Sequence, residues 1–65
     1  MTIEQIVDRC HVSESSLQVV RYVRSRLKPG AWAKLSREDR RCLVTTAIAC
    51  HQRNRETYRY VMFGR

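Results

Sequence analysis

Hydrophobic positions recur at helical spacing in three segments of the chain, and no segment alternates in the way a half-buried strand does. In the first segment, one helical face carries Ile3, Ile6, Val7 and Cys10. Thr2 can cap this helix, with Gln5 three residues later as the returning partner of a capping box. The pattern predicts a helix over residues 2–10.

The second periodic segment follows Ser13, which can cap a helix over residues 13–28. At about 100° per residue, its apolar side chains share an arc of about 160°. They are Leu17, Val19, Val20, Val23 and Leu27. Pro29 ends the helix, because the residue before a proline is pushed out of the α region. Residues 29–35 are predicted to form a loop, in which Trp32 either covers the base of the core or contacts a partner.

The third segment is the longest and predicts a helix over residues 36–63. Ser36 can cap it, and Glu38 and Asp39 fall in its first turn, where the helix dipole favours negative charge. Its apolar stripe consists of Leu43, Val44, Ala47, Ile48, Cys50, His51, Tyr58, Val61 and Met62. Asn54 and Arg55 fall inside this stripe and mark either a bend or a polar contact at an interface.

The length of the third predicted helix exceeds the size of the domain that must cover it. The chain has 65 residues, which suits one small helical domain over residues 1–65. A compact chain of this length has a radius of gyration near 11 Å and a diameter of roughly 28 Å, whereas the helix spans about 40 Å. A second copy is the simplest cover, so we expect an all-α homodimer. The expected interface residues are Leu43, Ala47, Ile48, His51, Tyr58, Val61 and Met62.

The charge balance adds a partner to this picture. The chain carries 13 Lys or Arg against 6 Asp or Glu, a net charge of +7, and the excess lies after residue 16. Arginine presents a planar fork that suits phosphate and carboxylate. The composition therefore predicts a polyanionic partner, either nucleic acid or an acidic protein.

Several other functions are not expected. No apolar run reaches the roughly 18 residues of a membrane span, and Glu4 near the start argues against a signal peptide. Three cysteines without framework spacing suggest free, buried thiols in a reducing cytoplasm. Adjacent Cys-His pairs, at residues 10–11 and 50–51, point about 100° apart on a helix and suit zinc poorly, so we expect no metal or cofactor.

Catalysis is not expected either. The chain is too short for a substrate cleft with its scaffold, and its two glycines supply no phosphate-cradling loop. A Cys-His nucleophilic pair would also need an oxyanion hole, for which no candidate is present. The protein is therefore expected to be a binding protein without a small-molecule substrate.

The first half of the chain contains a motif: a short amphipathic helix, a turn, and a second helix that opens at a serine. Residues 3–28, with "CHVSESSL" at their centre, resemble the helix-turn-helix of AraC-type bacterial regulators. The pattern matches at Ile6-Val7 in the first helix, His11 in the turn, Val12-Ser13, and the apolar pair Leu17 and Val20. The family has glycine where His11 stands, so the resemblance implies a left-handed backbone there.

The resemblance implies a recognition helix that opens at Ser13 and lies in a DNA major groove. Gln18 would read adenine edges, and Arg21 and Arg24 would hold phosphates. The implied DNA contacts are Ser13, Ser15, Gln18, Arg21, Tyr22 and Arg24. The size and basic charge also resemble the short early-region proteins of lambdoid bacteriophages, which implies a regulatory role.

Two functions remain as expectations. In the first, a basic helical regulator of transcription binds DNA through the helix-turn-helix and dimerises through its third helix. In the second, a homodimeric adaptor or inhibitor binds an acidic host protein rather than DNA. Salt-dependent binding to duplex DNA distinguishes the first from the second.

Overall fold

The computed structural model describes residues 2–63, in which every regular element is a helix. In chain order these are α1 (Ile3–Val7), α2 (Ser16–Ser25), α3 (Ala31–Lys34) and α4 (Arg37–Phe63). The described residues contain no strand. The predicted all-α class is therefore confirmed, with one more helix than the hydrophobic pattern indicated.

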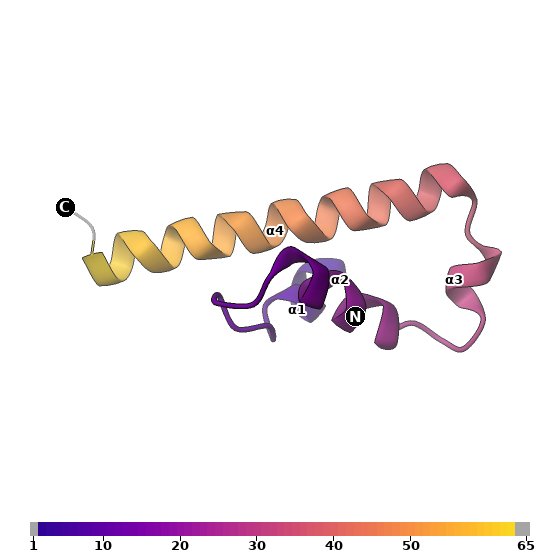
Figure 1. Ribbon diagram of the computed structural model, residues 1–65, viewed down its shortest axis with the longest axis horizontal. Helices are drawn as coiled ribbons and strands as arrows, with labels where there is room; N and C mark the ends of the chain where they lie inside the picture. The colour runs from indigo at the N-terminus through magenta and orange to yellow at the C-terminus, as the bar shows by residue number, and fades with distance from the viewer. Residues whose placement is uncertain (1, 64–65) are drawn as a thin grey trace.

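The molecule is elongated because α4 runs along its whole length (Figure 1). The principal extents are 45 × 19 × 19 Å and the radius of gyration is 12.9 Å, larger than that of a compact chain of this length. α1 and α2 lie beside the middle of α4, and its C-terminal part extends beyond them (Figure 1). α4 is one continuous helix of 27 residues, so Asn54 does not interrupt it.

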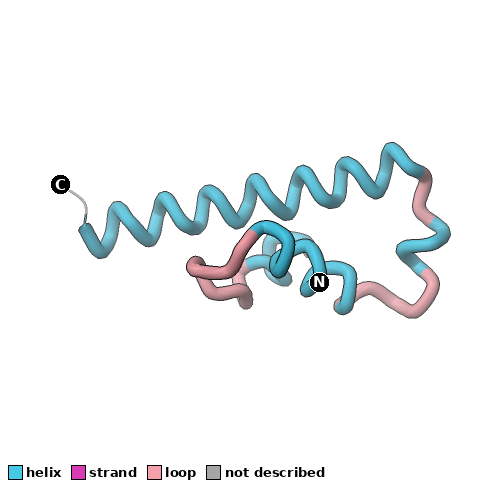
Figure 2. Tube along the Cα trace, viewed as in Figure 1, coloured by secondary structure: helices cyan, strands magenta, loops and turns pink. Residues whose placement is uncertain are grey.

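The first two helices are shorter than predicted. The capping box of α1 forms as expected between Thr2 and Gln5, but the helix ends at Val7 rather than at residue 10. The amides of Arg9 and Cys10 bond three residues back, to Ile6 and Val7, and this tighter pattern ends the α-helix. Figure 2 shows the loop that follows, from Asp8 to Ser15.

The second helix begins at Ser16 and ends at Ser25, inside the predicted range of 13–28. Ser15 caps it rather than Ser13, because the Ser15 hydroxyl accepts from the amide of Gln18. At the C-terminal end, the Ser25 hydroxyl donates to the carbonyl of Tyr22 at 2.6 Å. The backbone amides of Arg26 and Leu27 bond three residues back, to Val23 and Arg24, and this tighter pattern ends the helix before Pro29.

The segment predicted as a loop contains α3, a single turn after Gly30. Gly30 has φ = +81°, the left-handed conformation that glycine adopts without a Cβ clash. Ser36 then caps α4 as predicted, since its hydroxyl accepts from the amide of Asp39 at 3.1 Å.

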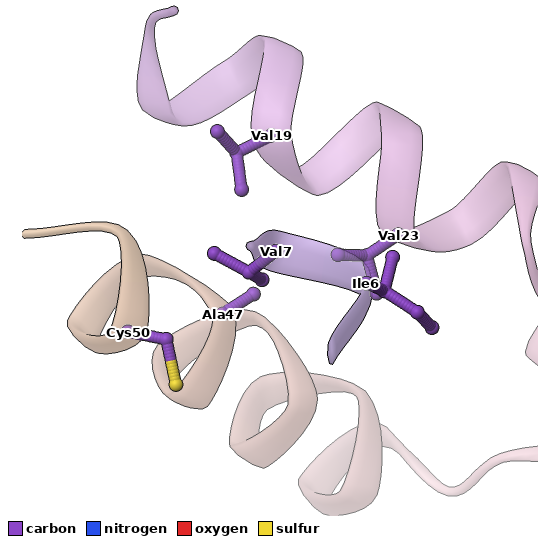
Figure 3. Close-up of a cluster of buried hydrophobic side chains, with 6 residues drawn as sticks. All are labelled: Ile6, Val7, Val19, Val23, Ala47 and Cys50. Atoms are coloured by element: carbon purple, nitrogen blue, oxygen red, sulfur yellow. The ribbon is translucent and has the colours of Figure 1, made fainter. Parts of the chain in front are cut away.

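The core is small and lies where α1, α2 and α4 meet (Figure 3). Its buried hydrophobic side chains are Ile6, Val7, Val19, Val23, Ala47 and Cys50. Leu17 does not join them and is 61% exposed. It lies about 200° around the helix from Val19, and the buried direction of α2 is centred on Val19 and Val23.

Two polar contacts fasten the loop after α1 to α4. His51 is buried, and its Nε2 lies 2.9 Å from the carbonyl oxygen of Glu14. Because a carbonyl only accepts, Nε2 donates this bond. The Asn54 amide donates to Asp8 at 2.8 Å. Asn54 thus makes its polar contact within the chain, whereas the sequence predicted either a bend, which the continuous helix does not show, or a contact at an interface.

Candidate nucleic-acid interface

Of the predicted DNA contacts, Gln18, Arg21 and Arg24 lie exposed on α2, and a capping box with Ser15 positions the first of them. The Ser15 hydroxyl accepts from the backbone amide of Gln18 at 3.3 Å, and the backbone amide of Ser15 donates to the Gln18 side-chain oxygen at 2.8 Å. Bidentate recognition of adenine needs both the oxygen and the NH₂ of a glutamine. The side-chain oxygen of Gln18 already accepts in the capping box, so reading adenine in that way competes with the cap.

The structure places the predicted serines and tyrosine differently from the expected recognition helix. Ser13 lies in the loop before α2, where its backbone amide donates to Nδ1 of His11 at 3.1 Å. The Ser13 hydroxyl oxygen lies 2.6 Å from the same nitrogen. Tyr22 was expected to point away from the core, but it is half-buried and packs against it. Its position on α2 faces the side on which α1 and α4 lie.

The connection between α1 and α2 departs from a tight helix-turn-helix. It runs from Asp8 to Ser15, about twice the three or four residues of that motif. His11 does not adopt the expected left-handed backbone, because no non-glycine residue among residues 2–63 has a positive φ. The bonds from Ser13 to the His11 ring shape this loop instead.

Arg21 and Arg24 are exposed, and neither has an ion-pair partner in the part of the chain described here. One ion pair forms within residues 2–63, between Arg53 and Glu4 at 3.5 Å, on exposed side chains. The α2 arginines therefore keep their hydrogen-bond donors available. Such unpaired arginines can bind phosphate or carboxylate in a bidentate manner.

Trp32 links α2 to α4 through two arginines, a cluster that hydrophobic periodicity could not reveal. The guanidinium carbon of Arg24 lies 4.4 Å from the centroid of the Trp32 ring, and that of Arg40 lies 5.6 Å from it. Both distances suit cation–π contact. Trp32 is half-buried and is not among the side chains packed on the core, so it does not cover the base of the core.

The predicted dimer interface divides into two parts. Ala47 and His51 are buried inside the chain at 0% and 1% exposure, so a partner cannot contact them in this conformation. Leu43 is half-buried against the same core, and Ile48 is also half-buried. The remaining predicted residues, Tyr58, Val61 and Met62, are exposed on the part of α4 that extends beyond α1 and α2.

A groove of about 610 Å³ lies between the loop after α1 and the C-terminal part of α4. Its lining residues are Val12, Ser13, Gln52, Arg55, Glu56, Tyr58 and Arg59. The mixture of arginine, tyrosine and polar side chains is typical of protein interfaces. Sequence analysis placed Tyr58 in the apolar stripe but did not place loop residues beside it.

The cysteines and histidines do not converge. Cys10 is half-buried, Cys42 is exposed and Cys50 is buried, so the expectation that all the free thiols are buried is wrong for Cys42. Burial raises the pKa of the Cys10 thiol, and a hydrogen bond to Glu14 and the negative charge of that carboxylate raise it further. Within residues 2–63, no three metal-binding side chains come together as a site.

No helix within residues 2–63 has both the length and the hydropathy needed to cross a bilayer. No protein-family model, no curated protein and no solved structure matches the chain.

Proposed function

We propose that this protein is a small basic helical regulator that binds DNA through α2 and dimerises through the C-terminal part of α4. The observation that carries the DNA-binding proposal is the exposed face of α2, where Arg21 and Arg24 have no acidic partner among the described residues. The net charge of +7 adds a long-range attraction to a polyanion. Phosphate contacts dominate this mode of binding, because Gln18 already uses its oxygen in the cap.

The test is binding to a generic DNA duplex, measured by fluorescence anisotropy over a series of salt concentrations. We expect Arg21→Gln to weaken binding and to reduce the salt slope by about 1, the effect of one lost phosphate contact. Arg53→Gln removes the same charge from α4, where the arginine is paired with Glu4, and serves as the matched control. Absence of binding at micromolar protein and low salt, or equal losses in both variants, contradicts the proposal.

Base reading by Gln18 can be separated from phosphate binding. Gln18→Ala removes the side-chain amide, which is both the cap partner and the group that would read a base. Ser15→Ala removes only the hydroxyl that accepts from the backbone amide of Gln18. If α2 reads adenine, Gln18→Ala weakens binding to preferred sequences more than Ser15→Ala does. If binding depends on phosphates alone, neither variant changes the preference among duplexes.

The dimer rests on the stripe that α4 carries past the core. Tyr58, Val61 and Met62 continue the helical face that buries Ala47 and Cys50, and all three are exposed. The C-terminal part of α4 extends beyond α1 and α2 (Figure 1). A second copy offers the same exposed stripe, so a two-fold pairing buries both at once. Two joined subunits also present two α2 helices to one duplex.

Sedimentation equilibrium at tens of micromolar tests the dimer. We expect wild-type protein to sediment as a dimer and Val61→Asp to sediment as a monomer, because the substitution places a charge in the paired stripe. Tyr60→Asp is the control, since Tyr60 is 75% exposed but lies about 100° away from Val61 around the helix. A monomeric wild type overturns the dimer.

A second candidate is an adaptor or inhibitor that binds an acidic protein, and the groove beside Tyr58 favours it. Arg55 and Arg59 line that groove together with Val12 of the loop, which combines positive charge with apolar surface. An adaptor of this kind predicts that Arg55→Gln and Arg59→Gln abolish capture of one specific host protein while Arg21→Gln does not. Salt-sensitive duplex binding that depends on Arg21 favours the regulator instead.

A further inference from the structure

A hollow of about 380 Å³ lies at the C-terminal end of α2, outside the face expected to read bases. Arg21, Arg24 and Lys28 line it, together with Trp32, and no acidic residue contributes to the lining. Arg21 and Arg24 are neighbours three residues apart on α2, and Lys28 lines the same hollow from the segment after the helix. The repulsion among these like charges raises the free energy of the empty site. An anion in the hollow removes that repulsion.

Arg24 is held in this hollow by contacts that leave its donors free. The Trp32 ring contacts the guanidinium group at 4.4 Å from the ring centroid. A guanidinium group has five N–H donors, and contact with one ring leaves those on its outer side free to bind an anion. Arg24 can therefore contact Trp32 and a phosphate at the same time.

Trp32 is itself held from α4. The Nε of Arg40 donates to the Trp32 carbonyl and its Nη2 donates to the Ala33 carbonyl, each at 3.0 Å. Arg40 is half-buried, and these bonds tie α3 to the start of α4. Two consecutive contacts thus connect α4 to Arg24: Arg40 holds α3, and Trp32 on α3 orients the Arg24 side chain. Such ordering before binding lowers the entropy lost when a ligand is captured.

We propose that this hollow binds a phosphate group, with Arg21, Arg24 and Lys28 as its ligands and Trp32 as the positioning residue for Arg24. The phosphate is that of a DNA backbone, and in this respect the inference rests on the proposed function. Trp32 orients Arg24 rather than stacking on a base, because its ring already contacts two guanidinium groups. The α2–α3 connection thereby becomes part of the DNA-binding surface.

The first experiment uses Trp32 as its own reporter, since it is the only tryptophan in the chain. Inorganic pyrophosphate and a DNA duplex are titrated separately while tryptophan emission is recorded. We expect both to change the emission and Arg24→Gln to weaken both responses. Arg53→Gln again controls for the loss of charge. If tryptophan emission stays constant while the duplex saturates the protein, the proposal that the hollow binds a DNA phosphate is wrong.

The second experiment separates positioning from folding. By anisotropy with a labelled duplex, Trp32→Leu should weaken binding roughly two- to fivefold, the factor that matches an exposed cation–π contact. Trp32→Phe, which keeps a ring under Arg24, should recover most of the affinity. In an Arg24→Gln background, Trp32→Leu should cause no further loss, because Trp32 acts through Arg24. Equal losses in both backgrounds show a merely structural role and overturn the positioning assignment.

The outcomes separate this inference from the proposed function. If wild type binds the duplex and the Trp32 and Arg24 variants bind it equally well, the hollow does not bind phosphate, and the proposal of a DNA-binding regulator is unaffected. If pyrophosphate changes the emission while no duplex binds, the phosphate site stands, its source is a free phosphate compound, and the DNA-binding proposal falls.

Discussion

The apolar stripe of α4 has the same character in its N-terminal and C-terminal halves, but α1 and α2 lie beside the middle of the helix and cover only the N-terminal half of the stripe. Ala47, Cys50 and His51 are buried there, whereas Tyr58, Val61 and Met62 are 42%, 73% and 58% exposed. Helical periodicity decides which face of α4 is apolar. Burial depends in addition on a second element of sufficient length, and α1 and α2 have five and ten residues.

The boundary between the two halves is marked by polar contacts. His51 binds the Glu14 carbonyl and, three residues later, Asn54 binds Asp8. Both partners belong to the loop between α1 and α2, which contacts α4 on the C-terminal side of the core residues Ala47 and Cys50. Polar side chains thus lie on the stripe at the point where α4 contacts a loop instead of packed helices. A loop has backbone groups that need hydrogen-bond partners, as the Glu14 carbonyl does.

The strongest test of this difference compares one valine from each region. Val19→Asp places an unpaired charge at a fully buried position, and it should remove most of a total stability of roughly 3–10 kcal/mol. Val61→Asp, on the uncovered half, should leave the monomer's free energy of unfolding within about 0.5 kcal/mol of wild type. Urea unfolding followed by circular dichroism measures both variants, at a protein concentration at which wild type and variants are monomeric. Equal destabilisation would mean that the C-terminal half is packed within the chain.

Loss of the buried histidine should have the next largest effect. His51→Ala removes the hydrogen bond to Glu14 and leaves that carbonyl without its partner, which should cost about 1–3 kcal/mol in the free energy of unfolding. His11→Ala is the control, because His11 is exposed and its contacts are local. If both variants unfold at the same urea concentration, the loop is not fastened to α4 through His51.

Two neighbouring residues at the boundary should differ in a smaller but measurable way. Asn54→Ala removes a 2.8 Å hydrogen bond from a half-buried side chain, and should cost about 1 kcal/mol. Arg53→Ala breaks an exposed pair at 3.5 Å, and should change stability by less than about 0.5 kcal/mol. The same chemical unfolding measurement applies. A larger loss in the arginine variant would place the boundary contact at Glu4 rather than at Asp8.

The smallest effect concerns the pH dependence of stability through Cys10. Its pKa is raised above the ordinary value of 9.0, by burial first and by Glu14 second. The folded state therefore holds the thiol proton more tightly than the unfolded state does, so stability falls as the pH rises through about 9. Cys10→Ser cannot ionise in this range, and its stability relative to wild type should rise between pH 8 and pH 10. A difference that does not change with pH contradicts the assignment.

Local sequence signals were sufficient for much of the fold. The caps at Thr2 and Ser36 were predicted from residue type and spacing, and both form. The continuous helix of α4 follows from the absence of glycine and proline between Arg37 and Phe63. These features depend on neighbours within one helical turn, where sequence spacing and spatial distance agree.

The ends of α1 and α2 were predicted from the sequence less accurately. Ser13 and Ser15 are both acceptable caps, and the choice of Ser15 is accompanied by a Gln18 side chain that completes its box. Ser13 instead binds the His11 ring. Competing local bonds of similar strength decided where each helix begins, and hydrophobic spacing does not distinguish between them.

By itself, the sequence determined the all-α class, the apolar face of α4 and the excess of positive charge, because each of these is local or additive along the chain. Only the tertiary structure decided that the cover of α4 ends near Asn54 and that Trp32 lies between Arg24 and Arg40. Those features join segments far apart in the sequence. Their contacts depend on where the loops place each helix, a property that periodicity does not encode.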